Sequence, residues 1–245
     1  MAYVIKLAIY SLIILSLTSL SASAKELLVV TEEWKPYNFT NDKGEVVGRA
    51  TKKVREVLAV AEIDYEIKVY PWVRAMKIAK ERPNTMIYSI YRTAEREADY
   101  EWACPLIRPV GVYFFKLKTR KDIQVASLED AKQYTSAVVK GNIYYDFLIQ
   151  HGFTQGDHLV VAADSKSFYK LFFKGRIDLV MSTEYIMSEE LKAAGLNDEE
   201  VTPLLEVTKA SQQRGCMAFS KDTDPMLIDR IRRALAKHNQ EFVGP

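Results

Sequence analysis

Strand-like and helix-like segments alternate along this chain, and that alternation limits the folds it can adopt. The apolar run 27–30 is typical of a buried strand, and the strict apolar–polar alternation over 63–69 predicts another strand. Between these two, apolar residues recur at helical spacing from Arg49, and after them a second helix is expected to begin at Pro71. A short strand is expected at 86–90. Strands and helices in this order predict βαβ units around a mostly parallel sheet.

The same alternation begins again in the middle of the chain. Strands are expected at 112–116, 136–139, 160–162 and 178–182. Helices are expected after the capping-box sequence at 127–130, over 143–150, over 167–174 and, near the end, over 227–238. This second set predicts two α/β lobes, each within the usual size range of a domain. A single doubly wound domain is the alternative architecture.

The first 24 residues have the pattern of a secretory signal peptide. A lone positive charge, Lys6, precedes the apolar run 7–20, which is shorter than a membrane-spanning helix. Small residues at 21–24 then provide a site for signal peptidase after Ala24. An uncleaved membrane anchor is the alternative. We therefore expect a soluble product that is exported to the periplasm and begins at Lys25.

The charge balance and the few metal-ligating residues argue against two classes of partner. The chain has 34 Lys and Arg against 32 Asp and Glu, so its net charge of +2 gives no electrostatic reason to expect nucleic acid. Three His and two Cys argue against a structural zinc site. The sequence has no Walker loop, GxGxxG or HExxH motif, and no recognisable nucleophile motif. We therefore expect no cofactor and no metal.

The two cysteines, Cys104 and Cys216, would meet an oxidising compartment after export. A disulfide between them is then permitted, provided that the fold brings their Cα atoms within about 7 Å of each other. Two buried free thiols are the alternative, because cysteine is also a common core residue.

Six segments, in the right order, resemble the motifs of one protein family. They read EWKPYNF at 33–39 followed by Gly44 and Gly48, SIYRTAER at 89–96, YEWACPL at 100–106, SLED at 127–130, VVKGN at 138–142 and FFKGRIDLV at 172–180. By these motifs the chain resembles the extracellular solute-binding proteins of the amino-acid-binding type, family 3. The resemblance extends over nearly the whole chain that follows the predicted signal peptide.

The resemblance implies an α/β, two-lobed periplasmic-binding-protein type II fold, called a Venus flytrap, with a ligand cleft between the lobes. Lobe I would comprise residues 25–111 and the return segment 206–245, and lobe II would comprise residues 112–205. Closure of two lobes around a small molecule is an established hinge motion of periplasmic binding proteins. The expected partners are a small-molecule ligand and a membrane permease or receptor, and the expected state is a monomer.

Arg96 stands where the family has the arginine that pairs with the α-carboxylate of an amino acid. Its guanidinium presents a rigid fork of donors, and a carboxylate accepts two of them side by side. A solvated surface arginine is the alternative. The resemblance also puts Ser89, Tyr91 and Thr93 along the cleft, with hydroxyl or backbone groups available to the ligand. Ordinary hydrogen bonding at a strand end is the alternative for each of them.

Trp34 and Trp72 stand where the family places aromatic side chains that sandwich the ligand. Flat rings supply contact area at little entropic cost and attract ammonium groups through their faces. Trp72 shares a helix face with apolar residues, so a core position is its alternative. Arg74 would add a second cation to the cleft unless it is simply solvated. In lobe II, Asn142 and Ile143 begin a helix whose unpaired N–H groups suit an anion.

One position departs from the family pattern. Where many amino-acid-binding members carry an Asp that holds the ligand's ammonium group, this chain has Thr183, followed by Glu184. A hydroxyl can accept a hydrogen bond from an ammonium group but cannot neutralise it, and an unpaired buried charge is costly. Either Glu184 replaces the Asp, or the ligand is not an ordinary α-amino acid. The sequence therefore predicts a small carboxylate as the ligand class.

These patterns predict an exported, non-enzymatic protein that captures a small carboxylate, such as an amino acid, for an ABC-type transporter. A binding protein that reports its ligand to a membrane receptor is one alternative. A dehydratase-like enzyme on the same fold, with Glu184 as general acid or base, is the other, because function depends on the site rather than on the fold.

Overall fold

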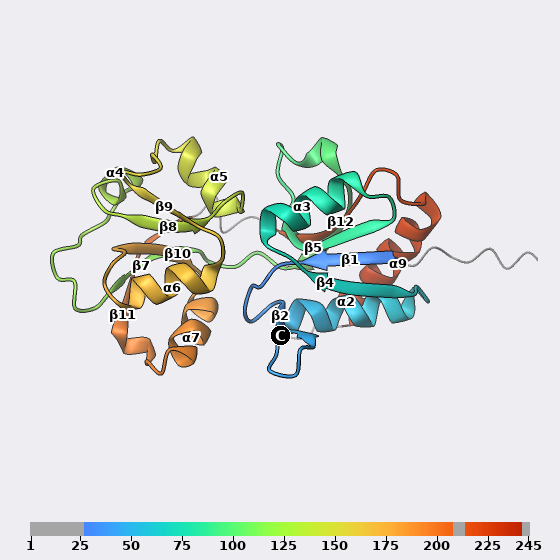
Figure 1. Ribbon diagram of the computed structural model, residues 1–245, viewed down its shortest axis with the longest axis horizontal. Coiled ribbons are helices and arrows are strands. Elements are labelled where there is room, and N and C mark those ends of the chain that lie inside the picture. Colours follow the sequence, from blue (N-terminus) through green and yellow to red (C-terminus); the bar gives the residue numbers. More distant parts are fainter. Residues whose placement is uncertain (1–26, 208–213, 242–245) are drawn as a thin grey trace, which may run out of the picture.

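The computed structural model describes residues 27–207 and 214–241, which form two five-stranded sheets and one two-stranded sheet (Figure 1). The predicted signal peptide, residues 1–24, lies outside these ranges. Within them, no helix is both long enough and apolar enough to cross a membrane.

The first sheet is built from both ends of the described chain. Its strands are β1 Leu27–Thr31, β4 Tyr65–Val69, β5 Thr85–Tyr91, β6 Glu101–Ile107 and β12 Gly215–Phe219. Their order in space is β4-β1-β5-β12-β6, with β1 parallel to β4 and β5, and with β12 antiparallel to β5 and β6. One face is covered by α3 Trp72–Glu81, and the other by α2 Arg49–Val60 and α9 Pro225–Glu241 (Figure 1). A short hairpin of β2 Phe39–Thr40 and β3 Val46–Val47 precedes α2.

The second sheet is built from the middle of the chain. Its strands are β7 Tyr113–Leu117, β8 Ser136–Val139, β9 Leu159–Ala162, β10 Leu179–Ser182 and β11 Val201–Glu206, in the spatial order β11-β7-β10-β8-β9. Its helices are α4 Leu128–Ala131, α5 Ile143–Gln150, α6 Ser165–Phe173 and α7 Glu184–Ala193. The capping box predicted at the start of α4 is present, with Ser127 and Asp130 each accepting from the other's backbone N–H.

The two sheets form separate lobes that lie side by side (Figure 1). Among the described strands, none of one sheet pairs with a strand of the other. The two-lobed α/β architecture expected from the sequence is therefore confirmed, and the single doubly wound domain is excluded. The chain passes from β6 to β7 on its way out and from β11 to β12 on its way back.

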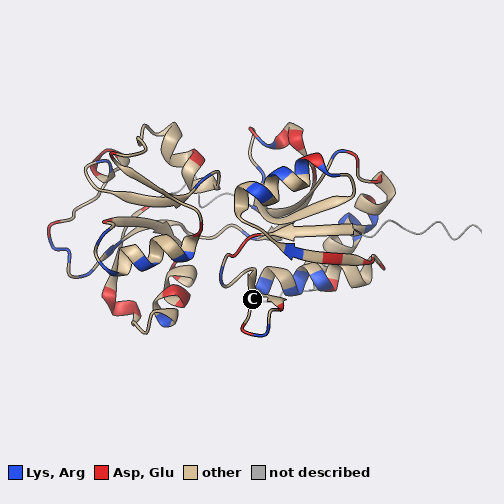
Figure 2. Ribbon diagram, in the orientation of Figure 1, with Lys and Arg blue, Asp and Glu red and all other residues tan. Residues whose placement is uncertain are grey.

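The edge strand β4 carries charged residues along its length (Figure 2). Glu66 and Lys68 form an ion pair there, with 2.9 Å between Oε2 and Nζ, and both side chains are exposed. Charges on an edge strand oppose its pairing with another chain, because the unpaired backbone groups would otherwise recruit a further strand.

Five strands and one α-helix of the structure were not expected from the sequence: β2, β3, β6, β11, β12 and α7. Pro105 in β6 and Pro203 in β11 read as strand breakers, because proline cannot donate to a sheet ladder. Both of these strands lie at the edge of a sheet, where a missing donor can be tolerated. The segment of β12 begins with Gly215, and glycine weakens a strand pattern, whereas β2 and β3 are only two residues long each.

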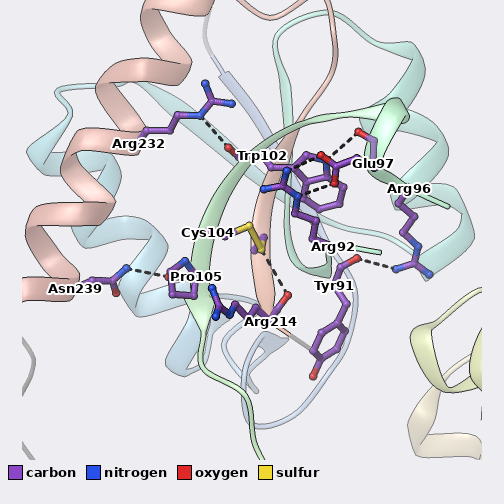
Figure 3. Close-up of a disulfide and its surroundings, with 11 residues drawn as sticks. Tyr91, Arg92, Arg96, Glu97, Trp102, Cys104, Pro105, Arg214, Arg232 and Asn239 are labelled. Carbon is purple, nitrogen blue, oxygen red and sulfur yellow. Dashed lines mark hydrogen bonds and ion pairs between the residues drawn. A yellow bond between two sulfur atoms is a disulfide. The ribbon is translucent and has the colours of Figure 1, made fainter. Parts of the chain in front are cut away.

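A disulfide joins Cys104 in β6 to Cys216 in β12 (Figure 3). Their Cα atoms are 4.7 Å apart, within the range that a disulfide can span. The bond links the strand from which the chain leaves the first lobe to the strand on which it returns. The disulfide therefore closes a loop that contains the whole second lobe.

Candidate functional site

A small cavity of about 50 Å³ lies between the two lobes. From the first lobe it is lined by Glu32, Trp34, Trp72, Ser89, Tyr91 and Arg96. From the second lobe it is lined by Val139, Asn142, Ile143, Tyr144, Ser165, Phe168, Tyr169, Met181, Ser182 and Ile186. A wider cleft of about 810 Å³ shares Glu32, Trp72 and Ser165 with this cavity. The wider cleft is within the usual size range of small-molecule sites, whereas the cavity alone is not.

Arg96 connects the two lobes. Its side chain is only 10 % exposed, and its Nη2 donates to Gly141 O and to Asp146 Oδ2 of the second lobe, both at 2.8 Å. Its Nη1 makes a longer bond of 3.4 Å to Tyr91 O, drawn in Figure 3. The guanidinium carbon lies 6.0 Å from the centre of the Trp72 ring. Arg96 is therefore a buried cation in the cleft, not a solvated surface arginine.

The two tryptophans lie on the first-lobe side of the cavity. Trp72 is buried at the beginning of α3, and its Nε1 donates to Gly141 O at 2.8 Å, so it also contacts the second lobe. Trp34 is part-buried against Tyr37, with 4.7 Å between ring centroids. The rings give the cavity an aromatic wall, which suits a flat or cationic part of a ligand.

Ser89 combines three features that indicate a binding role. It is the extra residue of a bulge in β5, where Cys216 and Met217 pair with its two neighbours. Its φ of 63° lies in the left-handed region, which is unfavourable for a residue other than glycine and is found often at functional sites. Its hydroxyl is buried in the cavity wall without a hydrogen-bond partner among the described residues. A ligand group could therefore complete the hydrogen bonding of Ser89.

The second lobe contributes the beginning of α5 and two buried tyrosines. Asn142 caps the helix, accepting from Tyr145 N at 2.8 Å, and Ile143 is its first residue. Burial raises the pKa of Tyr144 and of Tyr169, so both remain neutral phenols. Tyr169 shares a hydrogen bond of 2.8 Å with the hydroxyl of Ser182. Sequence reasoning missed both tyrosines, since aromatic residues on a helix read as core.

Glu32 was also missed by sequence reasoning, although it directly follows β1. The carboxyl ends of parallel strands border ligand sites in open α/β sheets, and this position is the signal that could have identified it. Its carboxylate has no hydrogen-bond or ion-pair partner within 27–207 and 214–241. Burial raises the pKa of Glu32 to about 8, although the positive charge of Arg96 opposes the shift. The cavity therefore contains one paired cation and one unpaired acid.

Four other candidates lie outside both cavities. Thr93 accepts from Arg96 N through its backbone oxygen at 3.1 Å, and Arg74 is exposed and stacks on the Tyr70 ring. Thr183 is buried, but its hydroxyl caps α7 by accepting from Ile186 N at 3.1 Å. Glu184 is exposed on the first turn of α7. The structure therefore does not bring Glu184 into the position of the family Asp, because it continues the helix that Thr183 caps.

Replacing Glu32 with glutamine is expected to stabilise the protein at high pH. The pKa of Glu32 is about 8 in the folded protein against an ordinary value of 4.5, so stability is lost as pH rises through this window. Glutamine mimics the protonated acid at every pH. At pH 8.5 we expect the free energy of unfolding of Glu32→Gln to be about 2 kcal/mol higher than that of wild type. This value is smaller than the whole pKa shift would give, because solvent near Glu32 partly stabilises its charged form.

The measurement for Glu32 is urea unfolding of both proteins at several pH values. The two curves should coincide near pH 4.5 and separate progressively up to pH 8. Equal stability of the two proteins at pH 8.5 would show that Glu32 titrates like an exposed carboxyl group.

A family model of bacterial extracellular solute-binding proteins, family 3, matches residues 27–242. Comparison with curated proteins finds no match. Among the described residues, no group of three or more His, Cys, Asp or Glu is placed to hold a metal ion.

Several solved structures share the fold. A histidine kinase sensor domain with similarity to periplasmic binding proteins aligns with a TM-score of 0.76 and 18% identity, over 89% of this chain and 91% of that chain. An ancestral arginine-binding protein bound to arginine aligns with a TM-score of 0.74 and 18% identity, over 88% and 93%. ArtJ, the arginine-, lysine-, histidine-binding protein of Geobacillus stearothermophilus, aligns with a TM-score of 0.73 and 17% identity, over 89% and 90%. The family model and the shared fold agree: the chain belongs to the bacterial extracellular solute-binding proteins, family 3.

Proposed function

We propose that this protein captures a small carboxylate-bearing ligand in the cleft between its lobes. The observation that carries the proposal is Arg96, whose buried guanidinium lies in the interlobe cavity and already contacts a carboxylate, that of Asp146. A guanidinium binds a carboxylate through two parallel hydrogen bonds, and burial strengthens this contact. A ligand carboxylate would bind Arg96 in the same way.

An amino acid fits the remaining groups of the site. On losing its proton, the Glu32 carboxyl group would hold an ammonium or guanidinium group, replacing the Asp that the family carries at the position of Thr183. The hydroxyl of Ser89 would accept from or donate to the ligand, and the rings of Trp34 and Trp72 would pack on it. The wider cleft would accommodate a side chain. The arginine-binding proteins that share the fold support this ligand class.

We also propose that the protein acts in the periplasm as a monomer. The pattern of residues 1–24 supports a signal peptide cleaved after Ala24, and the family is one of extracellular proteins. Two small lobes joined by two crossings of one chain form a complete binding unit, so a second copy is not needed to build the cleft.

The partner would be a membrane permease of the ABC type, to which the protein delivers its ligand. A sensory role is the second candidate, favoured by the likeness to a histidine kinase sensor domain. Uptake of radiolabelled ligand by cells with and without the gene distinguishes the two. Loss of uptake in the deletion strain supports delivery, whereas normal uptake with a lost transcriptional response supports sensing.

A thermal-shift screen tests the proposed ligand class. The protein is unfolded, dialysed and refolded to remove any ligand carried through purification, and then mixed with arginine, lysine, histidine, glutamine, other amino acids and keto acids. Tm should rise with concentration for at least one carboxylate, because ligand that binds only the folded state stabilises it. The proposal would be contradicted if Tm rose with the amide of a tested compound but not with the corresponding carboxylate.

Prolonged incubation with the compound that binds separates a binding protein from an enzyme. Unchanged ligand recovered at the end supports binding alone. Conversion of the ligand would instead support the dehydratase-like alternative, and the Glu32→Gln variant would then show whether the unpaired acid in the cavity takes part.

A further inference from the structure

We propose that Asp146 acts as an internal substitute for the ligand carboxylate, pairing with Arg96 and holding the lobes together until a ligand displaces it. This inference rests on the proposed function, because it assumes that the ligand carboxylate also binds Arg96. It assigns a role to a residue that the ligand itself need not touch.

The contacts of Arg96 show that its Nη2 group is already fully used. Nη2 has two N–H groups, and both are used by the second lobe, one by Gly141 O and one by Asp146 Oδ2, each at 2.8 Å. Nη1 donates within the first lobe to Tyr91 O. A carboxylate needs two neighbouring N–H groups for a bidentate contact. A ligand carboxylate can therefore reach this geometry only if Asp146 Oδ2 or Gly141 O gives up its Nη2 N–H, and Asp146 is the partner on a part-exposed side chain that can turn away.

Asp146 is more exposed than Arg96, so Asp146 is the partner that a ligand can displace. The Arg96 side chain is 10 % exposed, whereas the Asp146 side chain is 39 % exposed on the first turn of α5. When the lobes separate, Asp146 can become hydrated with little rearrangement. Burial raises the pKa of Asp146 and the Arg96 charge only partly opposes it, which indicates an imperfectly stabilised carboxylate. An incoming carboxylate would compete with it where a bidentate contact to Arg96 and further hydrogen bonds in the cavity offset the cost of removing both charges from water.

The Arg96–Asp146 pair is one of several contacts between the lobes. Trp72 Nε1 donates to Gly141 O at 2.8 Å beside it, and Gln150 Nε2 donates to Glu95 Oε1 at 3.2 Å on the exposed side. The pair links residues 50 positions apart, one from each lobe. Loss of the Asp146 charge should therefore shift the ligand-free protein toward open conformations without unfolding either lobe.

Small-angle X-ray scattering on ligand-stripped protein tests the contact without any ligand. We expect wild type to be compact and Asp146→Asn, which keeps the size of the side chain, to shift to a larger radius of gyration. Gln150→Ala, which removes an exposed interlobe hydrogen bond on the same helix, should remain as compact as wild type. An unchanged radius in Asp146→Asn, or equal opening in both variants, would overturn the inference.

Calorimetric titration then tests the competition. The probe is the carboxylate that gives the largest shift in the screen described above. Asp146→Asn should bind it about tenfold more tightly, a factor that corresponds to ~1.4 kcal/mol. Weaker binding would overturn the inference, because Asp146 would then belong to the ligand site itself. A failure of the proposed function gives a different result. Arg96→Ala would then still bind the probe, while Asp146→Asn would still have a larger radius of gyration than wild type.

Discussion

Replacing Arg96 with alanine is expected to weaken binding of the carboxylate identified in the screen by about 100-fold or more. Removing one partner of a buried, hydrogen-bonded charge pair costs about 2–5 kcal/mol, and ~2.7 kcal/mol corresponds to a factor of 100. The ligand carboxylate would then lie in a cavity of aromatic side chains with no cation beside it. Isothermal titration and the shift in Tm at fixed ligand concentration measure the loss.

Two further variants make the Arg96 result interpretable. Arg96→Lys keeps the charge but loses the planar fork, so it should bind more weakly than wild type and more tightly than Arg96→Ala. Arg92→Ala is the matched control, because Arg92 lies in the same loop and is exposed, paired with Glu97 (Figure 3). Binding by Arg92→Ala should equal that of wild type. If Arg96→Ala bound the carboxylate as tightly as wild type, the cation that we assign to the ligand would be the wrong one.

Removing the disulfide is expected to lower the free energy of unfolding by about 4–5 kcal/mol. Cys104 and Cys216 are separated by 112 positions, so their bond restricts a long loop in the unfolded chain. In the chain-entropy account, restriction of such a loop stabilises the fold by raising the free energy of the unfolded state. The double variant Cys104→Ala with Cys216→Ala should retain the fold, because both positions belong to strands that are also held by their sheet pairing.

Urea unfolding of the double variant and of wild type measures this effect. Wild type in the presence of a strong reductant is the control and should unfold at nearly the same urea concentration as the double variant. Labelling of the unfolded, unreduced wild type should find no free thiol. Two free thiols per chain in protein purified without reductant, with equal stability of variant and wild type, would contradict the role of the disulfide.

Local patterns were sufficient to predict most of the two lobes. The apolar run of β1 and the helical spacing of α2 are each determined by which side chains the element buries, and that information lies within a few neighbouring residues. The left-handed Gly152 and Gly175 that end α5 and α6 are equally local. Strands with proline, such as β6 and β11, depend on their place at a sheet edge, which a single sequence does not reveal.

The cleft was only partly predictable for a similar reason. Arg96, Trp34 and Ser89 lie in motifs with a recognisable order, Trp72 was assigned from its place in the family pattern, and the structure brings all four to one cavity. Glu32 and Tyr169 are ordinary residues in their local sequence, and only the approach of the two lobes makes them neighbours of the same cavity. The partner of Arg96 is 50 residues away in the other lobe, so the Asp146 contact required the three-dimensional structure.

The most direct test of the account is a crystal structure of the protein with the carboxylate that binds best. We predict that the ligand carboxylate lies between the lobes and that both of its oxygens accept hydrogen bonds from the Arg96 guanidinium. Asp146 should no longer contact Arg96. A ligand bound elsewhere, with the 2.8 Å contact between Arg96 and Asp146 intact, would contradict the central claim that Arg96 recognises the ligand.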